Sequence, residues 1–415
     1  MDSKVTFTGK TPGVCQKATL VIEQFLNENY RFRRNILNGK VEFATLPSSA
    51  DAAEGLSDDF NEVDLKFRTL TVEALNTIIR RAKKEQVLEK GNPKTEITEY
   101  AHSEDVPTFD PIGDYLSNLP KWDGQNHIAR LFSRLPGITT EQQGFLATWL
   151  LSAVAHWMQM DLLHGNECVP TLIGAQGCGK TTFFKRLLPP ELREYFLDHL
   201  NLSNKFDKEM ALTNNLIVNL DELEAIRPSQ HAALKQTLSK SKVNGRPIYG
   251  ASQEDRPRYA SFVATTNNLH PLTDATGSRR YICLTIPQGQ YIDNTGEIDY
   301  GQLYAQVVHE LKVAETPYWF DNNEVERIQQ LNQNYVTQLD MADIIAVCFR
   351  KPAEGESVKA LNSAEMLKVI QREYPSVKSD HSTKVHIGLA MKELGFEHTK
   401  RGCVAYYKAI PMRAA

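Results

Sequence analysis

The residues from Gly174 to Thr181 (GAQGCGKT) have the spacing of a phosphate-binding loop, GxxxxGK[ST]. Glycines in this pattern let backbone N–H groups turn toward phosphate oxygens, and the helix that follows adds its positive amino end. We expect Lys180 to reach the β- and γ-phosphates of ATP and Thr181 to provide a hydroxyl ligand for Mg²⁺. The expected nucleotide-binding residues are Gly174, Ala175, Gln176, Gly177, Cys178, Gly179, Lys180, Thr181 and Thr182.

Two acids follow an apolar segment further along the chain, where residues 215–220 (NLIVNL) are followed by Asp221 and Glu222. A carboxylate at the carboxyl end of such a strand points into the nucleotide crevice. We therefore expect Asp221 to hold Mg²⁺, directly or through water, and Glu222 to polarise the attacking water. A solvated strand end is the alternative, and the position of the pair shortly after the phosphate loop argues against it.

Further polar residues follow a second apolar strand, which starts at Ser261. Asn267 is the better candidate to contact the γ-phosphate or the attacking water, with its neighbour Asn268 or a capped turn as alternatives. Arg279 and Arg280 come next, just before another apolar run. Adjacent arginines are either solvated charge or an arginine finger that reaches the γ-phosphate bound to a neighbouring subunit. We expect a finger within this pair and slightly prefer Arg279.

From Val169 to about residue 335, the chain contains the strands and helices that would position these candidate ATP-site residues. Apolar runs at 171–173, 216–220, 261–265 and 281–286 alternate with helix-like segments. This alternation is typical of a parallel sheet with crossover helices, so an α/β fold is expected. Residues 111–165 are predicted to be mainly helical, with a helix start at Asp110-Pro111. The apolar stretch 145–160 is too short to span a bilayer and predicts a buried helix.

The two ends of the chain predict different units. Residues 1–50 contain a helix at 18–27 and a hairpin at 30–43 with its turn at Asn38-Gly39, and a helix follows at 70–87. Helices at 341–349, 364–373 and 384–394, then strands at 396–398 and 403–410 around Lys400 and Arg401, describe a winged helix. The second of these helices is capped by Asn362 with Glu365. The expected domains are an N-terminal α+β region (1–104), a helical domain (105–168), the P-loop ATPase core (169–335) and a winged-helix-like domain (336–415).

Composition limits the possible classes of protein. A chain of 415 residues favours two or three domains, and a net charge of −4 excludes a nucleic-acid binder that is basic throughout. Six cysteines without CxxC spacing favour reduced thiols over a zinc site or a disulfide framework. The first residues lack the apolar core of a signal peptide, so we expect a cytoplasmic protein without a membrane partner.

The four pieces of the ATP site, in this order, resemble an AAA+ ATPase, and their compact spacing resembles superfamily 3 helicases of viruses and plasmids. More narrowly, the chain resembles the virulence-associated E family of phages, pathogenicity islands and mobilisable elements. The residues that carry this resemblance are Pro111–Leu116 (PIGDYL), Lys121–Gly124 (KWDG), Gly174–Thr181, Asp221-Glu222, Thr265–Asn267 and Gly277–Tyr281.

The resemblance implies a helicase-like motor in the replication of such an element, usually a hexameric ring, inside a bacterial or phage-infected cell. It also implies a primase or another replication protein as a partner. Fuller members carry a primase-polymerase-like N-terminal domain. The residues before position 100 are too few for one, so we do not expect self-contained priming. The C-terminal unit resembles domains appended to relatives in Bacteroides-type bacteria.

Basic residues between the Asp221 strand and the Asn267 strand predict contact with single-stranded or forked DNA. In the superfamily 3 pattern a hairpin at this place enters the ring channel, where cations hold phosphates and a flat side chain stacks on a base or sugar. A solvated basic loop is the alternative. The candidates are Lys240, Lys242, Arg246 and Tyr249, followed by Arg256 and Arg258.

The C-terminal unit is a second candidate for DNA contact. Residues 341–415 contain 12 Lys and Arg against 8 Asp and Glu, a net charge of +4. Cations on the expected recognition helix and wing suit a phosphate backbone, although winged helices also dock proteins. These residues are Lys384, His386, Lys392, Lys400 and Arg401.

The function expected from these observations is an ATP-hydrolysing, DNA-translocating motor, a replicative helicase of a phage or mobile element. One alternative is an AAA+ switch or loader that remodels a protein–DNA assembly without unwinding. Another is a DNA-binding module whose ATP site is only structural, and the combination of Lys180, Asp221 and Glu222 argues against it.

Overall fold

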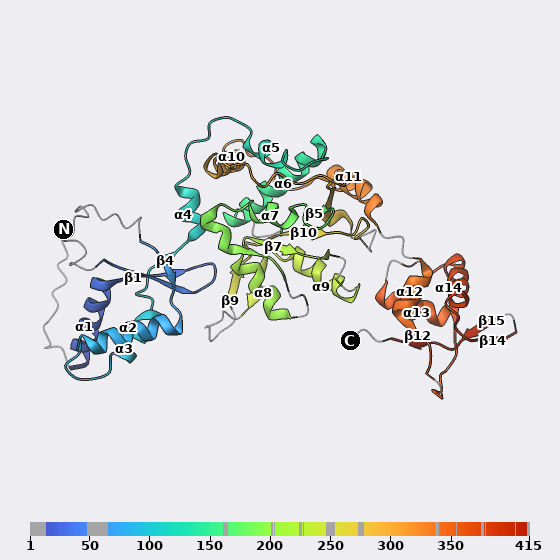
Figure 1. The fold of residues 1–415 in the computed structure, drawn as a ribbon, viewed down its shortest axis with the longest axis horizontal. Coiled ribbons are helices and arrows are strands. Elements are labelled where there is room, and N and C mark those ends of the chain that lie inside the picture. Colours follow the sequence, from blue (N-terminus) through green and yellow to red (C-terminus); the bar gives the residue numbers. More distant parts are fainter. Residues whose placement is uncertain are drawn as a thin grey trace, which may run out of the picture. The chain divides into compact units, whose positions relative to one another are not determined.

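The computed structural model describes residues 14–47, 65–160, 165–245 apart from 201, 203, 224, 225 and 227, 254–272, 278–336, and 340–412 apart from 354, 375, 376, 378 and 403. The chain divides into two compact units, one formed by the residues up to Tyr115 and one that takes up nearly all of the chain from Leu116 onward. Figure 1 shows the elements of both units.

The first unit packs helices on one face of a four-stranded sheet of order β3-β2-β1-β4. The expected hairpin is confirmed: β1 and β2 are antiparallel, and Gly39 takes a φ of +68° in their turn. Tyr30, Phe32 and Phe43 are buried on the helix side, as the alternation along the strands requires. The elements are α1 (Val14–Asn29), β1 (Tyr30–Asn35), β2 (Val41–Thr45), β3 (Arg68–Thr69), α2 (Val72–Lys84), α3 (Pro93–His102) and β4 (Thr108–Phe109).

Helices precede the main sheet, as expected. The helix start at Asp110-Pro111 is confirmed, because the Asp110 carboxylate accepts a hydrogen bond from Ile112 N at 3.0 Å. The apolar stretch at 145–160 lies largely within α6 and is mostly buried. No helix in the described ranges is long and apolar enough to cross a membrane. These helices are α4 (Pro111–Ser117), α5 (His127–Phe132) and α6 (Thr140–Trp157), and α10 (Tyr300–Lys312) packs against α5 and α6.

A five-stranded parallel sheet of order β11-β5-β10-β7-β6 forms the centre of the second unit. Its middle strands are buried on both faces, which explains why the sequence shows continuous apolar runs instead of alternation. The order places the carboxyl ends of β5, β10 and β7 side by side. The strands are β5 (Val169–Ile173), β6 (Phe196–Leu197), β7 (Ile217–Leu220), β10 (Ser261–Thr266) and β11 (Tyr281–Thr285).

Short helices and a hairpin connect these strands. The hairpin expected between the Asp221 and Asn267 strands is present as β8 (Lys242–Gly245), antiparallel to β9 (Glu254–Pro257). The remaining elements of the core are α7 (Lys180–Lys185), a 3₁₀ helix at Pro190–Tyr195, α8 (Lys205–Asn214), α9 (Pro228–Ser239), a 3₁₀ turn at Ser278–Arg280, α11 (Asn322–Asn332) and a 3₁₀ turn at Gln333–Tyr335.

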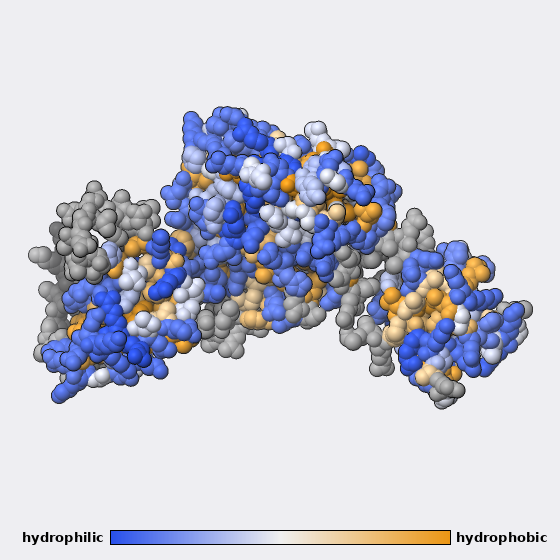
Figure 2. Space-filling model, in the orientation of Figure 1, coloured by the Kyte–Doolittle hydropathy of each residue, from blue (hydrophilic) through white to orange (hydrophobic). Residues whose placement is uncertain are grey.

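The residues after 340 form a hydrophobic core of their own beneath three helices and an antiparallel sheet of order β13-β15-β14. The expected capping box is confirmed, since the Asn362 side chain accepts from Glu365 N and the Glu365 side chain accepts from Asn362 N. Figure 2 shows apolar residues gathered over α12 and α13. The elements are α12 (Met341–Cys348), β12 (Phe349–Arg350), β13 (Leu361–Asn362), α13 (Ser363–Glu373), α14 (His381–Glu393), β14 (His398–Arg401), β15 (Val404–Tyr407) and β16 (Ile410–Pro411).

Three boundaries in this unit differ from expectation. Helix α14 begins at His381 because Asp380 caps it, accepting a hydrogen bond from Thr383 N at 2.7 Å. Phe396 is not in a strand but is buried in the core, so β14 begins at His398 and includes Lys400 and Arg401. The strand expected at 403–410 is interrupted, and it divides into β15 and the start of β16.

Candidate functional site

The loop between β5 and α7 has the backbone that phosphate binding needs. Gly177 and Gly179 have φ angles of +80° and +95°, which favour glycine, and Gly179 is the N-cap residue of α7. A Cβ on Gly174 would lie 3.0 Å from the Cβ of Ile286, so only glycine fits there without movement. The loop therefore leads into a helix whose first N–H groups have no intrahelical acceptor.

The side chain of Lys180 points back under this loop. Its exposed fraction is only 7%, and its Nζ donates to Gly174 O at 2.8 Å, to Ala175 O at 2.9 Å and to Asn267 Oδ1 at 2.9 Å. Asn268 is occupied differently, because its Oδ1 accepts a hydrogen bond from His270 N in a tight turn. The structure thus brings Asn267, and not Asn268, to the lysine of the loop.

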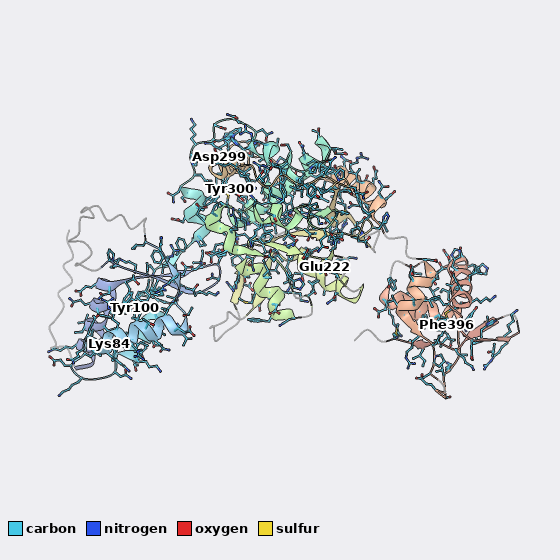
Figure 3. All side chains as sticks on the ribbon, viewed as in Figure 1. Lys84, Tyr100, Glu222, Asp299, Tyr300 and Phe396 are labelled. Atoms are coloured by element: carbon cyan, nitrogen blue, oxygen red, sulfur yellow. The ribbon has the colours of Figure 1, made fainter. Side chains whose placement is uncertain are left out.

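The two acids leave the end of β7 in different ways. The Thr265 hydroxyl, on the neighbouring strand β10, donates a hydrogen bond to Asp221 Oδ1. Glu222 has a φ of +50°, a left-handed backbone that costs a non-glycine residue roughly 1–2 kcal/mol. Figure 3 labels Glu222 in the central part of the chain. Both acids are exposed and directly follow the carboxyl end of β7.

One cavity of about 290 Å³ collects these groups. Its volume is at the lower end of the range for small-molecule sites. Thr181 and Asp221 offer oxygen ligands of the kind that Mg²⁺ prefers, so the donor set fits this metal. Cys178 is buried at the side of the loop and does not line the cavity. The lining residues are Gln176, Gly177, Gly179, Lys180, Thr181, Thr182, Asp221, Glu222, Thr266 and Asn267.

A segment after β11 is hydrogen-bonded to the backbone of the phosphate loop, and this contact was not predicted from the sequence. Ile292 N donates to Cys178 O at 3.0 Å, and Asn294 Nδ2 donates to Gly179 O at 2.9 Å. Arg134 and Arg186 both donate to Gly296 O, at 2.9 and 2.6 Å. These contacts fix the loop backbone through residues that carry no sequence motif of their own.

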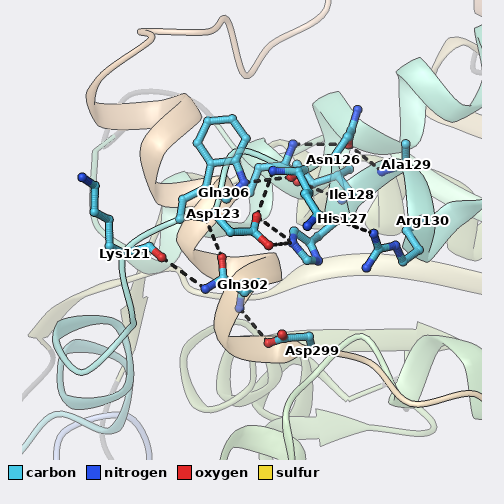
Figure 4. A network of polar contacts seen from close by, with 12 residues as sticks. Lys121, Asp123, Asn126, His127, Ile128, Ala129, Arg130, Asp299, Gln302 and Gln306 are labelled. Carbon is cyan, nitrogen blue, oxygen red and sulfur yellow. Dashed lines mark hydrogen bonds and ion pairs between the residues drawn. The ribbon is translucent and has the colours of Figure 1, made fainter.

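The Trp-Asp-Gly element (Trp122–Gly124) connects helices and is not among the residues that line the 290 Å³ cavity. Asp123 Oδ1 lies 3.0 Å from His127 Nε2, and Gln302 Oε1 accepts a hydrogen bond from Asp123 N at 2.9 Å (Figure 4). The pKa of Asp123 is lowered, first by the hydrogen bond from Gln125 N and also by His127. Gln306 Oε1 accepts from Ile128 N at 3.0 Å. The element therefore joins the start of α5 to α10.

The arginine pair lies at the other end of the sheet. Both arginines precede Tyr281, which pairs with Val169 at the amino end of β5, whereas the phosphate loop follows Ile173 at the carboxyl end. Five residues of strand separate these ends by about 15 Å. Arg279 is exposed, and Arg280 Nε is 3.3 Å from Glu167 Oε2. The pair is thus not brought to the cavity of its own chain.

A different cavity, of about 260 Å³, is lined by the arginine pair together with Glu167, Cys168 and Trp319. The Trp319 side chain is 60% exposed beside it. Asn332, on α11, is buried and donates to Ser278 O at 2.7 Å and to Tyr281 O at 2.5 Å. These two hydrogen bonds fix the backbone on both sides of the pair. Gly277 is outside the described residues.

Comparison with known proteins now identifies the family. The model of the virulence-associated protein E-like domain matches residues 116–337, which is more than half of the chain. The chain belongs to this family. No curated protein matches the sequence.

Solved structures similar to this virulence-associated E-like chain include the apo C-terminal region of NrS-1, residues 305–718. It is 12% identical, with 94% of this chain and 98% of that chain covered and a TM-score of 0.42. SCCmec type IV Cch, described as an active helicase, is 10% identical, with 92% of each chain covered and a TM-score of 0.35. Because these TM-scores are low, the family assignment rests on the family-model match to residues 116–337 and not on these structures.

Within the virulence-associated E-like domain, the basic hairpin carries fewer free cations than its sequence indicates. Lys242 is exposed on β8 and pairs with Asp255 at 2.7 Å, while Lys240 Nζ is 3.6 Å from Glu209 Oε1. The two lysines and the two acids line a cavity of about 730 Å³ with Lys208. Arg246 and Tyr249 lie outside the described residues, so their placement stays a prediction.

Arg258 is not available to a strand of DNA, contrary to its place in the expected basic segment. Its exposed fraction is 1%, and its guanidinium donates to the carbonyl oxygens of Asn166, Leu238, Lys240 and Ala260. Burial lowers the pKa of Arg258 to about 9, and the four carbonyls satisfy the charge that remains at neutral pH. Arg258 therefore anchors the base of the hairpin to the core.

Beyond residue 337, where the virulence-associated E-like domain ends, the C-terminal cations are accessible in part. Lys400 and Arg401 are exposed on β14, and Lys384 is half-buried on α14. His386 and Lys392 are exposed on the same helix, and Leu389 between them is 58% exposed. Its outer face thus mixes basic and apolar side chains.

Proposed function

We propose that this chain is an ATP-hydrolysing motor that moves on DNA, a replicative helicase of a phage or mobile element. The observation that carries this proposal is the single cavity shared by Lys180, Asp221, Glu222 and Asn267. Membership of the virulence-associated E-like family supports the setting of a mobile element.

In the proposed reaction, Lys180 contacts the β- and γ-phosphates, and Asn267, already bonded to Lys180, contacts the γ-phosphate or the attacking water. Glu222 orients that water and accepts its proton. Mg²⁺, when bound, neutralises charge on the phosphates, and Thr181 and Asp221 are the side chains that would hold it.

The arginine pair suggests how the motor assembles. Because it stands at the amino end of the sheet, we propose that it completes the site of a neighbouring chain in a hexameric ring. The proposed AAA+ core spans 169–335 and follows an α+β region (1–104) and a helical domain (105–168). We propose a winged helix for 336–415, supported by its β13-β15-β14 sheet and by the order α-β-α-α-β-β that remains when the separate short pair β12-β16 is set aside. A primase or another replication protein is the proposed partner.

The test uses the full chain with ATP, Mg²⁺, single-stranded DNA and a forked duplex. We expect ATP hydrolysis that single strands stimulate, and displacement of one strand of the fork. Lys180→Ala should abolish nucleotide binding and both activities. Lys185→Ala is the matched control, because Lys185 on the same helix is exposed and lies 3.9 Å from Asp198. Hydrolysis without displacement would favour a loader or switch, and wild-type protein that does not hydrolyse ATP would refute the proposal.

A further inference from the structure

Two polar side chains are buried beneath Asp221, in strands that are otherwise mostly apolar. Asn219 on β7 is 0% exposed and Thr265 on β10 is 1% exposed. A polar group in such a place destabilises the fold unless it is hydrogen-bonded. Asn219 Nδ2 lies 3.5 Å from Thr265 Oγ1, and Thr265 Oγ1 in turn bonds to Asp221 Oδ1.

The direction of these bonds follows from the chemistry of the groups. An amide NH₂ only donates and an ionised carboxylate only accepts, while a hydroxyl has a single proton. Asn219 therefore donates to Thr265, and the one proton of Thr265 is committed to Asp221. The strand register agrees: Val263 pairs with Asn219 and Ala264 with Leu220, so Thr265 comes level with Asp221.

The same network leaves one atom unsatisfied. Asn219 Oδ1 is buried, and no described residue donates to it. An orphaned buried acceptor costs stability, and leucine would fill this place in the sheet without that cost. The amide is therefore better explained by what its nitrogen does for Thr265 than by its contribution to the fold.

Resting on the proposed function, we propose that Asn219 and Thr265 are positioning residues for the metal-holding carboxylate. Thr265 engages Oδ1 of Asp221, and Asn219 directs the Thr265 proton, so that Oδ2 is left for Mg²⁺ in the cavity that Asp221 lines. Strand β10 then has two roles, because Asn267 directly follows its carboxyl end and bonds to Lys180. One strand end thus aligns the metal-holding acid and the phosphate-sensing amide.

The test compares the binding of a fluorescent ADP analogue in Mg²⁺ and in EDTA. For the wild type we expect Mg²⁺ to tighten binding. Thr265→Val, which keeps the shape and removes the donor, should lose about tenfold of that tightening while binding in EDTA is unchanged. Thr265→Ser should restore it, and Asn219→Leu should give a smaller loss because the hydroxyl can then rotate. In turnover, Thr265→Val should need more Mg²⁺ for half-maximal hydrolysis.

A matched control separates positioning from packing. Thr171 on β5 is similarly buried, but within the described residues its hydroxyl bonds only to Val169 O, at 3.0 Å, so Thr171→Val should leave the Mg²⁺ effect unchanged. The proposal is overturned if Thr265→Val retains the wild-type Mg²⁺ effect, or if Mg²⁺ does not tighten wild-type binding at all. A wild type that binds the Mg²⁺ complex tightly and never hydrolyses ATP refutes the motor and leaves this proposal standing.

Discussion

The two ends of the five-stranded sheet differ in how complete they are. At the carboxyl end, Lys180 bonds to Asn267 and Asp221 to Thr265, so the groups are already aligned within one chain. At the amino end, Arg279 is exposed and Arg280 pairs with Glu167 on the rim of a separate cavity. Each chain thus carries an aligned cavity at one end of the sheet and, about 15 Å away along the strands, an arginine pair that lines a different cavity.

Under the proposed function, this difference makes the smallest complete site an interface between two chains. In the proposed ring, a head-to-tail contact would join the carboxyl end of one sheet to the amino end of the next. The changes below separate the two ends by their effects, from the largest expected loss to the smallest.

The largest loss is expected at the carboxyl end. Glu222→Gln should lower ATP turnover by about 10²–10⁴-fold, because the water loses its base, while ATP stays bound. Glu191→Gln, an exposed acid in the 3₁₀ helix before β6, is the control and should behave as wild type. Single-turnover hydrolysis and equilibrium binding measure both effects. Wild-type turnover by the Gln variant would show that Glu222 is not the base.

A loss of up to about 10³-fold is expected at the amino end, in turnover but not in nucleotide affinity. Arg279→Ala and Arg280→Ala, tested separately, identify which arginine is the finger. If Arg280 only pairs with Glu167, then Glu167→Gln and Arg280→Ala should lower thermal stability alike and leave hydrolysis intact. If either arginine acts within its own chain, its loss should depress the hydrolysis of isolated monomers, which contradicts the interface.

The smallest effect on basal hydrolysis is expected at the basic hairpin, which belongs to neither end. Changing Lys242 and Arg246 together to Ala should weaken single-strand binding and flatten its salt dependence by about 0.7 per lost contact. Tyr249→Ala should weaken binding without changing that slope, since stacking releases no counterions. Asp255→Asn should act in the opposite direction, because it frees Lys242 from a 2.7 Å ion pair.

Titrations of DNA binding at several salt concentrations measure these slopes. Suppose that the double variant binds single strands normally while a chain ending near residue 335 does not. The main contact with single-stranded DNA would then lie in the C-terminal unit, at Lys384, Lys400 and Arg401, and a loader or switch would explain the protein better than a helicase.

Local signals explain what could be predicted from the sequence. Glycine spacing marked the phosphate loop, buried apolar runs marked the parallel strands, and Asn362 with Glu365 marked a helix start. Contacts between distant residues left no such signal. Examples are the hydrogen bond from Asn294 to Gly179 O, the hydrogen bonds from Asn332 on both sides of the arginine pair, and the ion pair of Asp255 with Lys242. Arg258 looked like a solvated cation because its carbonyl partners come from three separate segments.

Polar residues within apolar strands are a second kind of signal in the sequence, and the predictions above did not use it. Asn219 and Thr265 are polar residues inside apolar strands, and a buried polar residue needs a partner. Two of them, each two residues before a candidate catalytic group, indicate support for that group. Which of their atoms meet depended on the strand register, which no local pattern fixes.

The most direct test of a site shared between chains is a mixing experiment. The experiment mixes two variants. One is Glu222→Gln, whose arginines are intact, and the other is whichever of Arg279→Ala and Arg280→Ala is inactive, whose acids are intact. Alone, each should be nearly inactive. Mixed, some interfaces join an intact acid to an intact arginine, so ATP hydrolysis should recover to a fraction of wild type that depends on the mixing ratio. Hydrolysis that stays at the sum of the two separate variants at every ratio, in assemblies shown to exchange subunits, would contradict the account.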